Sequence, residues 1–330
     1  MPVIPSRFHP PAFLASGHLQ TILPVLLPRR ISLAATRERL ELSDGDFLDL
    51  DWTRAGHDRL AIISHGLEGN STQKYVRGLA ATLHAAKWDV LAWNFRGCSG
   101  EPNRLLRAYH SGDTADLAAV IAHAARDCPR IALVGFSLGG NVTLTSVGEA
   151  PPHPAIVAAA AISAPLDLAT SARALDQRCG NRLYLRRFIV PLVAKIEAKA
   201  RDFPGQVNTD GLRAIRSFQE FDGRFTAPLH GFRDAEDYWT RASARQFLPK
   251  VTVPTLILSA RNDPFLTTDS LPYVEAEANP ALNLETPDSG GHVGFLDFQH
   301  GLQPWSERRV AEFFSAPRPL PGSRDHLHQG

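Results

Sequence analysis

The sequence predicts an α/β fold in which a mostly parallel central sheet carries helices on both faces. Short apolar runs such as residues 60–64 and 130–134 are typical of strands buried on both sides. These runs alternate with segments of helical periodicity, and that alternation produces parallel sheets. In addition, residues 135–139 read Gly-Phe-Ser-Leu-Gly between one such strand and a helix-compatible run. The 330 residues, 44% of them hydrophobic, are enough to build a large core.

The individual elements follow from the same periodicities. A hairpin is expected within residues 31–53, because Ser43-Asp-Gly-Asp46 is a turn sequence between two strand-like runs. Ser111 and Asp113 stand where the capping side chains of a helix are expected. Further strands are expected at residues 60–64, 89–95, 130–134, 156–163, 253–259 and 282–286, and helices at 72–87, 111–126, 141–147, 182–200 and 303–314.

One region interrupts this alternation. Between about residues 167 and 250 no clear strand-like run occurs, and amphipathic helical pieces stand in its place. We therefore expect a helical cap over the carboxyl ends of the strands. The predicted division is a first core part at 1–166, the cap insertion at 167–250, a second core part at 251–315 and a flexible tail at 316–330.

Composition and charge exclude several classes of function. The 35 basic and 34 acidic residues give a net charge of +1, so no nucleic-acid-binding surface is indicated. The three cysteines are scattered and form no C-x-x-C, so neither a disulfide framework nor a zinc site is expected. The N-terminal segment is a poor signal peptide, and no apolar segment is long enough to span a membrane. We therefore expect a cytoplasmic protein with no transmembrane segment.

Ser137 is the candidate nucleophile. It is the central residue of a G-x-S-x-G motif, a sharp strand-to-helix turn that lifts one serine hydroxyl out of the backbone. The flanking glycines are needed because larger side chains would collide in so tight a turn. A helix N-terminus then supplies N–H groups that are free to hold an anion.

A serine hydroxyl requires a base, and the base requires an orienting carboxylate. In α/β hydrolases these follow in the order Ser, Asp or Glu, His. Asp263 comes just after the strand expected at 253–259, and His292 comes after the last strand in Ser-Gly-Gly-His-Val-Gly. The competing candidates are Asp269, Asp288 and His300, which lie in less suitable settings.

Two backbone N–H groups should stabilise the oxyanion of an acyl-transfer reaction. One belongs to the residue after the nucleophile, Leu138. The other should come from the glycine-rich loop after the strand at 60–64, where Leu67 is the natural donor. The sequence thus predicts a complete site for nucleophilic acyl transfer.

Several further motifs extend along nearly the whole chain, and with them the sequence resembles the YheT-like branch of the α/β-hydrolase superfamily, also called the AB hydrolase 4 family. The matching segments are GHLQTILP (17–24), HGLEGNS (65–71), NFRGCSGEPNR (94–104), YHSGDTADL (109–117), GFSLGGN (135–141), FDGRFTAPLHGFRDAEDYW (221–239), NDPF (262–265) and GGHVGF (290–295). The resemblance implies an esterase-type serine hydrolase. By motif position, its triad also falls on Ser137, Asp263 and His292.

The expected activity is hydrolysis of short- to medium-chain acyl esters through an acyl-enzyme, without a metal or organic cofactor. Alternatives are an acyltransferase or a lipase or phospholipase that uses the same intermediate, and a non-catalytic binding protein on a hydrolase scaffold. The partner is expected to be a small-molecule ester with an apolar acyl chain. Candidate pocket residues are Phe188, Trp239, Phe265, Phe295 and Arg96.

Three of the singled-out side chains have competing interpretations. Arg96 either holds an anionic group of the substrate or anchors its loop by pairing with Asp113 or Asp116. Cys98 is expected to pack rather than react, because it lacks an elbow. His110 is either a second base or the donor or acceptor of a structural hydrogen bond.

Overall fold

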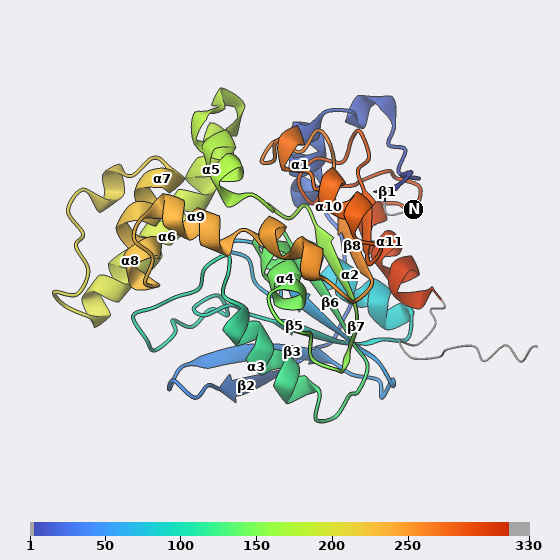
Figure 1. Cartoon of the computed structure of the whole chain (residues 1–330), viewed down its shortest axis with the longest axis horizontal. Coiled ribbons are helices and arrows are strands. Elements are labelled where there is room, and N and C mark those ends of the chain that lie inside the picture. The colour runs from blue at the N-terminus through green and yellow to red at the C-terminus, as the bar shows by residue number, and fades with distance from the viewer. Residues whose placement is uncertain (1–2, 317–330) are drawn as a thin grey trace, which may run out of the picture.

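The computed structural model describes residues 3–316 and confirms the predicted α/β class (Figure 1). Within those residues, nine strands form one sheet in the spatial order β1-β9-β8-β7-β6-β4-β5-β3-β2. The pairs β2–β3 and β3–β5 are antiparallel, and all other neighbours are parallel. The strands are β1 (Val3–Ile4), β2 (Thr36–Glu41), β3 (Phe47–Thr53), β4 (Leu60–Ser64), β5 (Asp89–Trp93), β6 (Ile131–Phe136), β7 (Ile156–Ile162), β8 (Thr255–Leu258) and β9 (Leu282–Glu285).

Helices cover both faces of the sheet because successive strand residues point to opposite sides. Ile63 and Val134 pack under α2 (Lys74–Ala85) and α11 (Trp305–Ser315). Their neighbours Ile62 and Leu133 belong to the other core, which contains residues of α3 (Thr114–Ala124) and α4 (Leu138–Gly148). The central strands are therefore apolar throughout, as the sequence predicts.

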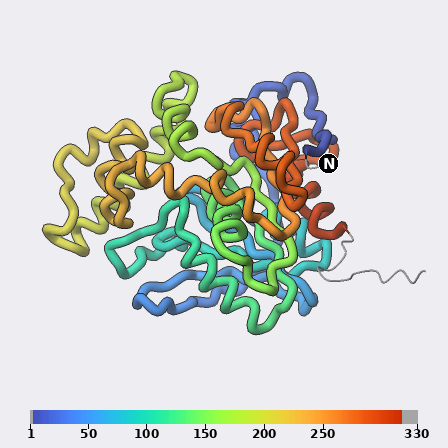
Figure 2. Tube along the Cα trace, viewed as in Figure 1, coloured from blue at the N-terminus to red at the C-terminus, as the bar shows by residue number. Residues whose placement is uncertain are grey.

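Between β7 and β8 the described chain is helical, without a strand. The segment includes α5 (Leu168–Gln177), α6 (Arg182–Asp202), α7 (Phe218–Phe221), a π-helical turn at Asp222–Thr226, α8 (Ala227–Leu229) and α9 (Ala235–Ala242). These helices share an apolar core of their own, and Figure 2 shows them as a lobe beside the sheet. Residues 244–250 instead pack against α4, in the core beneath the sheet.

Two local expectations differ from the structure. Asp113 occupies the N-cap position of α3, but its carboxylate accepts from Arg107 at 2.8 Å and not from the helix backbone. Ser111 accepts from the hydroxyl of Tyr238 at 2.9 Å. Both side chains thus hydrogen-bond to residues outside the helix and do not cap its N-terminus.

The N-terminal segment contains elements that the sequence pattern does not reveal. β1 pairs with the edge strand β9, and a helix, α1 (Gly17–Leu26), follows it. The remaining helices are α10 (Tyr273–Ala278) and 3-10 turns at Ala12–Leu14, Cys179–Asn181, Leu212–Ala214, Ala244–Lys250 and Thr268–Ser270. No helix in residues 3–316 combines the length and apolar character needed to cross a bilayer. Beyond Ala316, the predicted flexible tail lies outside the described residues.

Candidate active site

Ser137 stands at the turn between β6 and α4, in a backbone conformation that few non-glycine residues adopt. Its φ is 51° and its ψ is −120°. A Cβ on Gly135 would lie 2.1 Å from the carbonyl oxygen of Gly139, and a Cβ on Gly139 would lie 2.4 Å from that of His65. Both glycines are therefore required by the close approach of the backbone.

Three side chains from separate strand ends form a hydrogen-bonded chain. His292 Nε2 lies 2.9 Å from Ser137 Oγ, and His292 Nδ1 lies 2.8 Å from Asp263 Oδ2. Asp263 is only 3% exposed, and its other carboxylate oxygen accepts from the backbone N–H of Phe265 at 2.8 Å. This arrangement fixes Nδ1 as the protonated nitrogen and leaves Nε2 to accept a proton from the serine.

The loop that carries His292 is strained and is held from outside. Val293 and Phe295 both have positive φ, at 63° and 45°. The N–H of His292 donates to Thr21 Oγ1 at 2.9 Å, and Gln20 bonds both the N–H and the carbonyl of Leu296, at 2.8 and 3.0 Å. The segment GHLQTILP, whose role sequence reasoning did not assign, thus positions the histidine.

The loop at residues 65–70 lies against the nucleophile. A Cβ built on Gly66 would be 3.4 Å from Ser137 Cβ. His65 is fully buried and accepts through Nε2 from the N–H of Phe95 at 3.2 Å, while Nδ1 donates to the carbonyl of Gly66 at 2.7 Å. Burial lowers the pKa of His65 to about 4, so this imidazole is a neutral support of the loop.

A polar network joins the same loop to the cap. Glu68, which has a φ of 53°, accepts from the hydroxyl of Tyr109 at 2.7 Å and from Lys195 Nζ at 2.8 Å. Lys195 belongs to α6 and also donates to Cys98 Sγ at 3.1 Å. This network places one side chain of the cap against the residue that follows Leu67.

A cavity of about 150 Å³ opens onto Ser137 and His292. Leu67 and Leu138 line it, as do the predicted pocket residues Phe188, Trp239 and Phe265. The cap contributes further apolar side chains to the lining, among them Leu168, Leu175, Leu192, Phe218, Phe221 and Phe225.

Two predicted pocket residues lie elsewhere. Phe295 is fully buried in the core on the face of the sheet that α2 and α11 cover, where its ring contacts Phe8 at 5.7 Å and Trp305 at 6.4 Å between centroids. Arg96 is 3% exposed and forms two hydrogen bonds with Asp116, at 2.8 and 2.7 Å, and a third with Asp46 at 3.0 Å. Its guanidinium anchors a loop and does not line the cavity.

The remaining candidate nucleophile and base have structural surroundings. Burial raises the pKa of the Cys98 thiol to about 11, which keeps it protonated at neutral pH. His110 lines the cavity, but burial lowers its pKa to about 3, and its Nδ1 accepts from the N–H of Gly112 at 3.1 Å. Of the competing acids, Asp288 pairs with Arg261 at the surface, and Asp269 lies in a 3-10 turn.

Comparisons with known proteins agree with this architecture. The α/β hydrolase fold family matches residues 62–299. A curated protein named "Putative esterase YheT" from Escherichia coli is 35% identical over 94% of this chain and 93% of its own length. Phospholipase ABHD3 of Mus musculus is 27% identical over 90% of this chain and 75% of its own length.

Among solved structures, an esterase of Pyrococcus furiosus superposes with a TM-score of 0.57 at 18% identity. The match covers 87% of this chain and 96% of that one. This likeness concerns the fold, whereas the curated relatives extend it to sequence over almost the full length. The chain therefore belongs to the α/β-hydrolase family, in the branch of YheT-like ester hydrolases.

Proposed function

We propose that the protein is a serine carboxylesterase that cleaves short- to medium-chain acyl esters. The observation that carries the proposal is the hydrogen-bonded chain Ser137–His292–Asp263 at the mouth of an apolar cavity. Such a chain activates a serine for attack on a carbonyl carbon, and the cavity offers apolar walls to an acyl group.

In the proposed mechanism, Ser137 Oγ attacks the ester carbonyl while His292 Nε2 takes the hydroxyl proton. Asp263 orients the imidazole and stabilises its charged form. The backbone N–H groups of Leu67 and Leu138 hold the oxyanion of the tetrahedral intermediate. His292 then protonates the leaving alcohol, and water, deprotonated by the same nitrogen, hydrolyses the acyl-serine to the carboxylic acid.

The size of the cavity supports a short acyl chain. An apolar protein cavity of about 150 Å³ accommodates benzene, so this one has room for an acyl group of about six carbon atoms. Each methylene that enters should contribute about 0.8 kcal/mol, or roughly a fourfold rise in kcat/KM, until the cavity is full.

The first test is hydrolysis of p-nitrophenyl esters from acetate to palmitate. Ser137→Ala should reduce kcat by at least about 10⁴-fold, because it removes the hydroxyl on which the acyl-enzyme is proposed to form. Ser43→Ala, in an exposed turn, is the matched control and should retain full activity. Undiminished turnover by Ser137→Ala would contradict the proposal.

The chain-length preference provides a second test. Leu192 lines the cavity and is only partly buried, so Leu192→Trp should shift the preferred ester to a shorter chain by filling space. Leu183→Trp places the same ring on the same helix at a site that is 78% exposed and should leave the preference unchanged. If both variants preferred esters of the same chain length, the cavity would not be the site that holds the acyl chain.

Hydrolysis and acyl transfer use the same acyl-enzyme and differ only in the acceptor. Product analysis with and without added ethanol distinguishes them, because a transferase forms the ethyl ester at the expense of the free acid. We expect the free acid to predominate. A dominant ethyl ester at low ethanol concentration would favour the acyltransferase alternative.

A further inference from the structure

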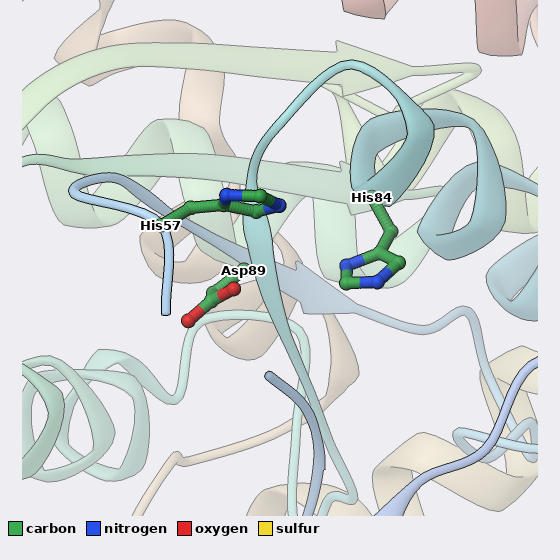
Figure 3. Close-up of side chains that lie close together, drawn as sticks. All are labelled: His57, His84 and Asp89. Carbon is green, nitrogen blue, oxygen red and sulfur yellow. The ribbon is translucent and has the colours of Figure 1, made fainter. Parts of the chain in front are cut away.

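We propose that His57, His84 and Asp89 form a binding site for a late first-row divalent cation, with Zn²⁺ as the ion best suited to it. One ligand atom from each residue lies within 4.8 Å of the other two. Figure 3 shows the three side chains entering the same space from a loop, a helix end and the start of a strand. Two imidazoles and one carboxylate are a ligand set that Zn²⁺ prefers, whereas Mg²⁺ and Ca²⁺ prefer oxygen alone.

The position in the fold separates this cluster from the catalytic residues. Asp89 is the first residue of β5 and pairs in register with Leu60, the first residue of β4. His57 lies just before β4, so the cluster is at the amino ends of these strands. Ser137 follows the carboxyl end of the adjacent parallel strand β6, roughly 16 Å away along a five-residue strand.

Hydrogen bonds orient two of the three ligands. His84 Nδ1 lies 3.3 Å from the carbonyl oxygen of Trp88, and a carbonyl can only accept, so Nδ1 carries the proton. The lone pair of His84 is then on Nε2. Asp89 Oδ1 accepts from the N–H of Ala55 at 2.8 Å, which fixes the carboxylate and leaves Oδ2 for an ion. Outer-shell bonds of this kind commonly support metal ligands.

The three side chains are buried only in part, which leaves them accessible to an ion from solvent. Asp89 is 9% exposed, and both histidines are half-buried, so an ion could enter and retain a water as its fourth ligand. The centroids of the two imidazoles are 5.7 Å apart. Tetrahedral ligands about 2.1 Å from zinc lie roughly 3.4 Å from one another, so small side-chain rotations complete the site.

The nearby cations are directed away from the cluster. Arg59 donates to the carbonyls of Ala86 and Lys87, and its guanidinium lies over the ring of Trp88 at 4.7 Å. Arg54 lies over the ring of Trp52 at 3.8 Å. Asp89 therefore provides its negative charge without forming an ion pair with either arginine.

A bound ion would join three pieces of the core: the loop before β4, the end of α2 and the start of β5. We therefore assign it a stabilising role, independent of the proposed esterase activity. The cysteine pattern of the sequence predicts no zinc site, because the three cysteines form no C-x-x-C. These ligands instead come from positions 27 and 5 residues apart, which only the fold brings together.

The test is calorimetric titration of the untagged full chain with ZnCl₂. The sequence also contains His326 and His328, outside the described residues, so the background carries H326Q and H328Q. This background should bind one Zn²⁺ per chain, and MgCl₂ at the same concentrations should give no heat of binding. Saturating Zn²⁺ should raise the unfolding temperature by a few degrees.

Three variants in that background decide the proposal. His84→Gln and Asp89→Asn should each weaken Zn²⁺ binding by at least about tenfold and abolish the thermal shift. The amide oxygen introduced by Asp89→Asn can still accept from the N–H of Ala55, so this variant should fold normally, as far-UV circular dichroism would verify. His123→Gln is the matched control, because His123 has a single carboxylate partner, Glu38, at 2.9 Å. The proposal would be overturned if the background protein bound no stoichiometric Zn²⁺, or if the background and all three variants bound Zn²⁺ with equal affinity.

Discussion

Asp222 is a carboxylic acid enclosed within the helical insertion. It is 8% exposed, accepts from Trp239 Nε1 at 2.8 Å and from Thr226 Oγ1 at 2.7 Å, and lines the cavity. Burial raises its pKa to about 6, although the two hydrogen bonds oppose that rise. The folded protein therefore retains this proton at pH values where the unfolded chain has lost it.

This retained proton gives a pH dependence of definite sign. A folded-state pKa above the unfolded value stabilises the protein most at low pH, and that stability is lost as the pH rises from about 4 through about 6. Asp222→Asn has no proton to lose. Between pH 4 and pH 7 the wild type should lose about 2 kcal/mol of unfolding free energy relative to this variant. Urea titrations of both proteins at the two pH values measure how the unfolding free energy of each changes between pH 4 and pH 7. The same change in wild type and variant would refute the prediction.

The roles of single residues were predictable only where a motif restricts the backbone. The G-x-S-x-G turn and the order Ser, Asp, His point to Ser137, Asp263 and His292, and in the structure His292 lies within hydrogen-bonding distance of each of the other two. The placement of Phe295 in the pocket is wrong, and of the two interpretations of Arg96 the structure bears out the pairing with Asp116. Whether a side chain near a strand end points to a cavity or to the core depends on partners that are distant in the sequence.

Helix α1 illustrates how an element can be missed. Its sequence is a poor helix signal, because it starts with glycine, contains Pro24 and leaves most of its apolar side chains exposed. What holds it in place is a set of polar contacts to the loop that carries His292. Contacts of this kind join distant segments and produce no periodic pattern in the sequence. The buried central strands are apolar throughout, and the sequence therefore predicts their bounds to within about two residues.

We expect Thr21→Val in α1 to impair the proposed catalysis. The change preserves the shape of the side chain but removes the acceptor for the His292 N–H, and an unpaired buried N–H costs about 1–3 kcal/mol. The imidazole should then lose its fixed position, so kcat should fall roughly tenfold or more with little change in KM.

Thr143→Val is the matched control for this prediction. The hydroxyls of Thr21 and Thr143 both donate to the carbonyl four residues earlier, at 2.7 and 2.8 Å, but only Thr21 accepts from the histidine loop. Steady-state kinetics on a p-nitrophenyl ester, together with thermal unfolding, separates the two effects. Equal losses of kcat in both variants would show that α1 does not position His292.

The stability of the molecule depends on buried charges that join distant elements. Arg96 connects the loop after β5 to Asp116 in α3 and to Asp46 in the β2–β3 turn. Arg96→Met would leave Asp116 buried without its partner, and we expect a loss of about 3–5 kcal/mol of unfolding free energy. Arg130→Met removes an exposed pair with Asp58 and should cost less than about 1 kcal/mol. Chemical denaturation of both variants provides the comparison, and similar losses would contradict the assigned role of Arg96.

The pairing of β1 with β9 has a consequence for biosynthesis. A ribosome makes the chain from its N-terminus, and domains generally begin to fold as they emerge. Val3 and Ile4 must nevertheless wait for Leu284 and Glu285, which are translated some 280 residues later. The contacts of Gln20 and Thr21 with the histidine loop are delayed in the same way. Residues 3–4 and 20–21 thus reach their docked positions only after residues 284–296 have been made, and the nascent chain holds an incomplete triad until His292 has been translated.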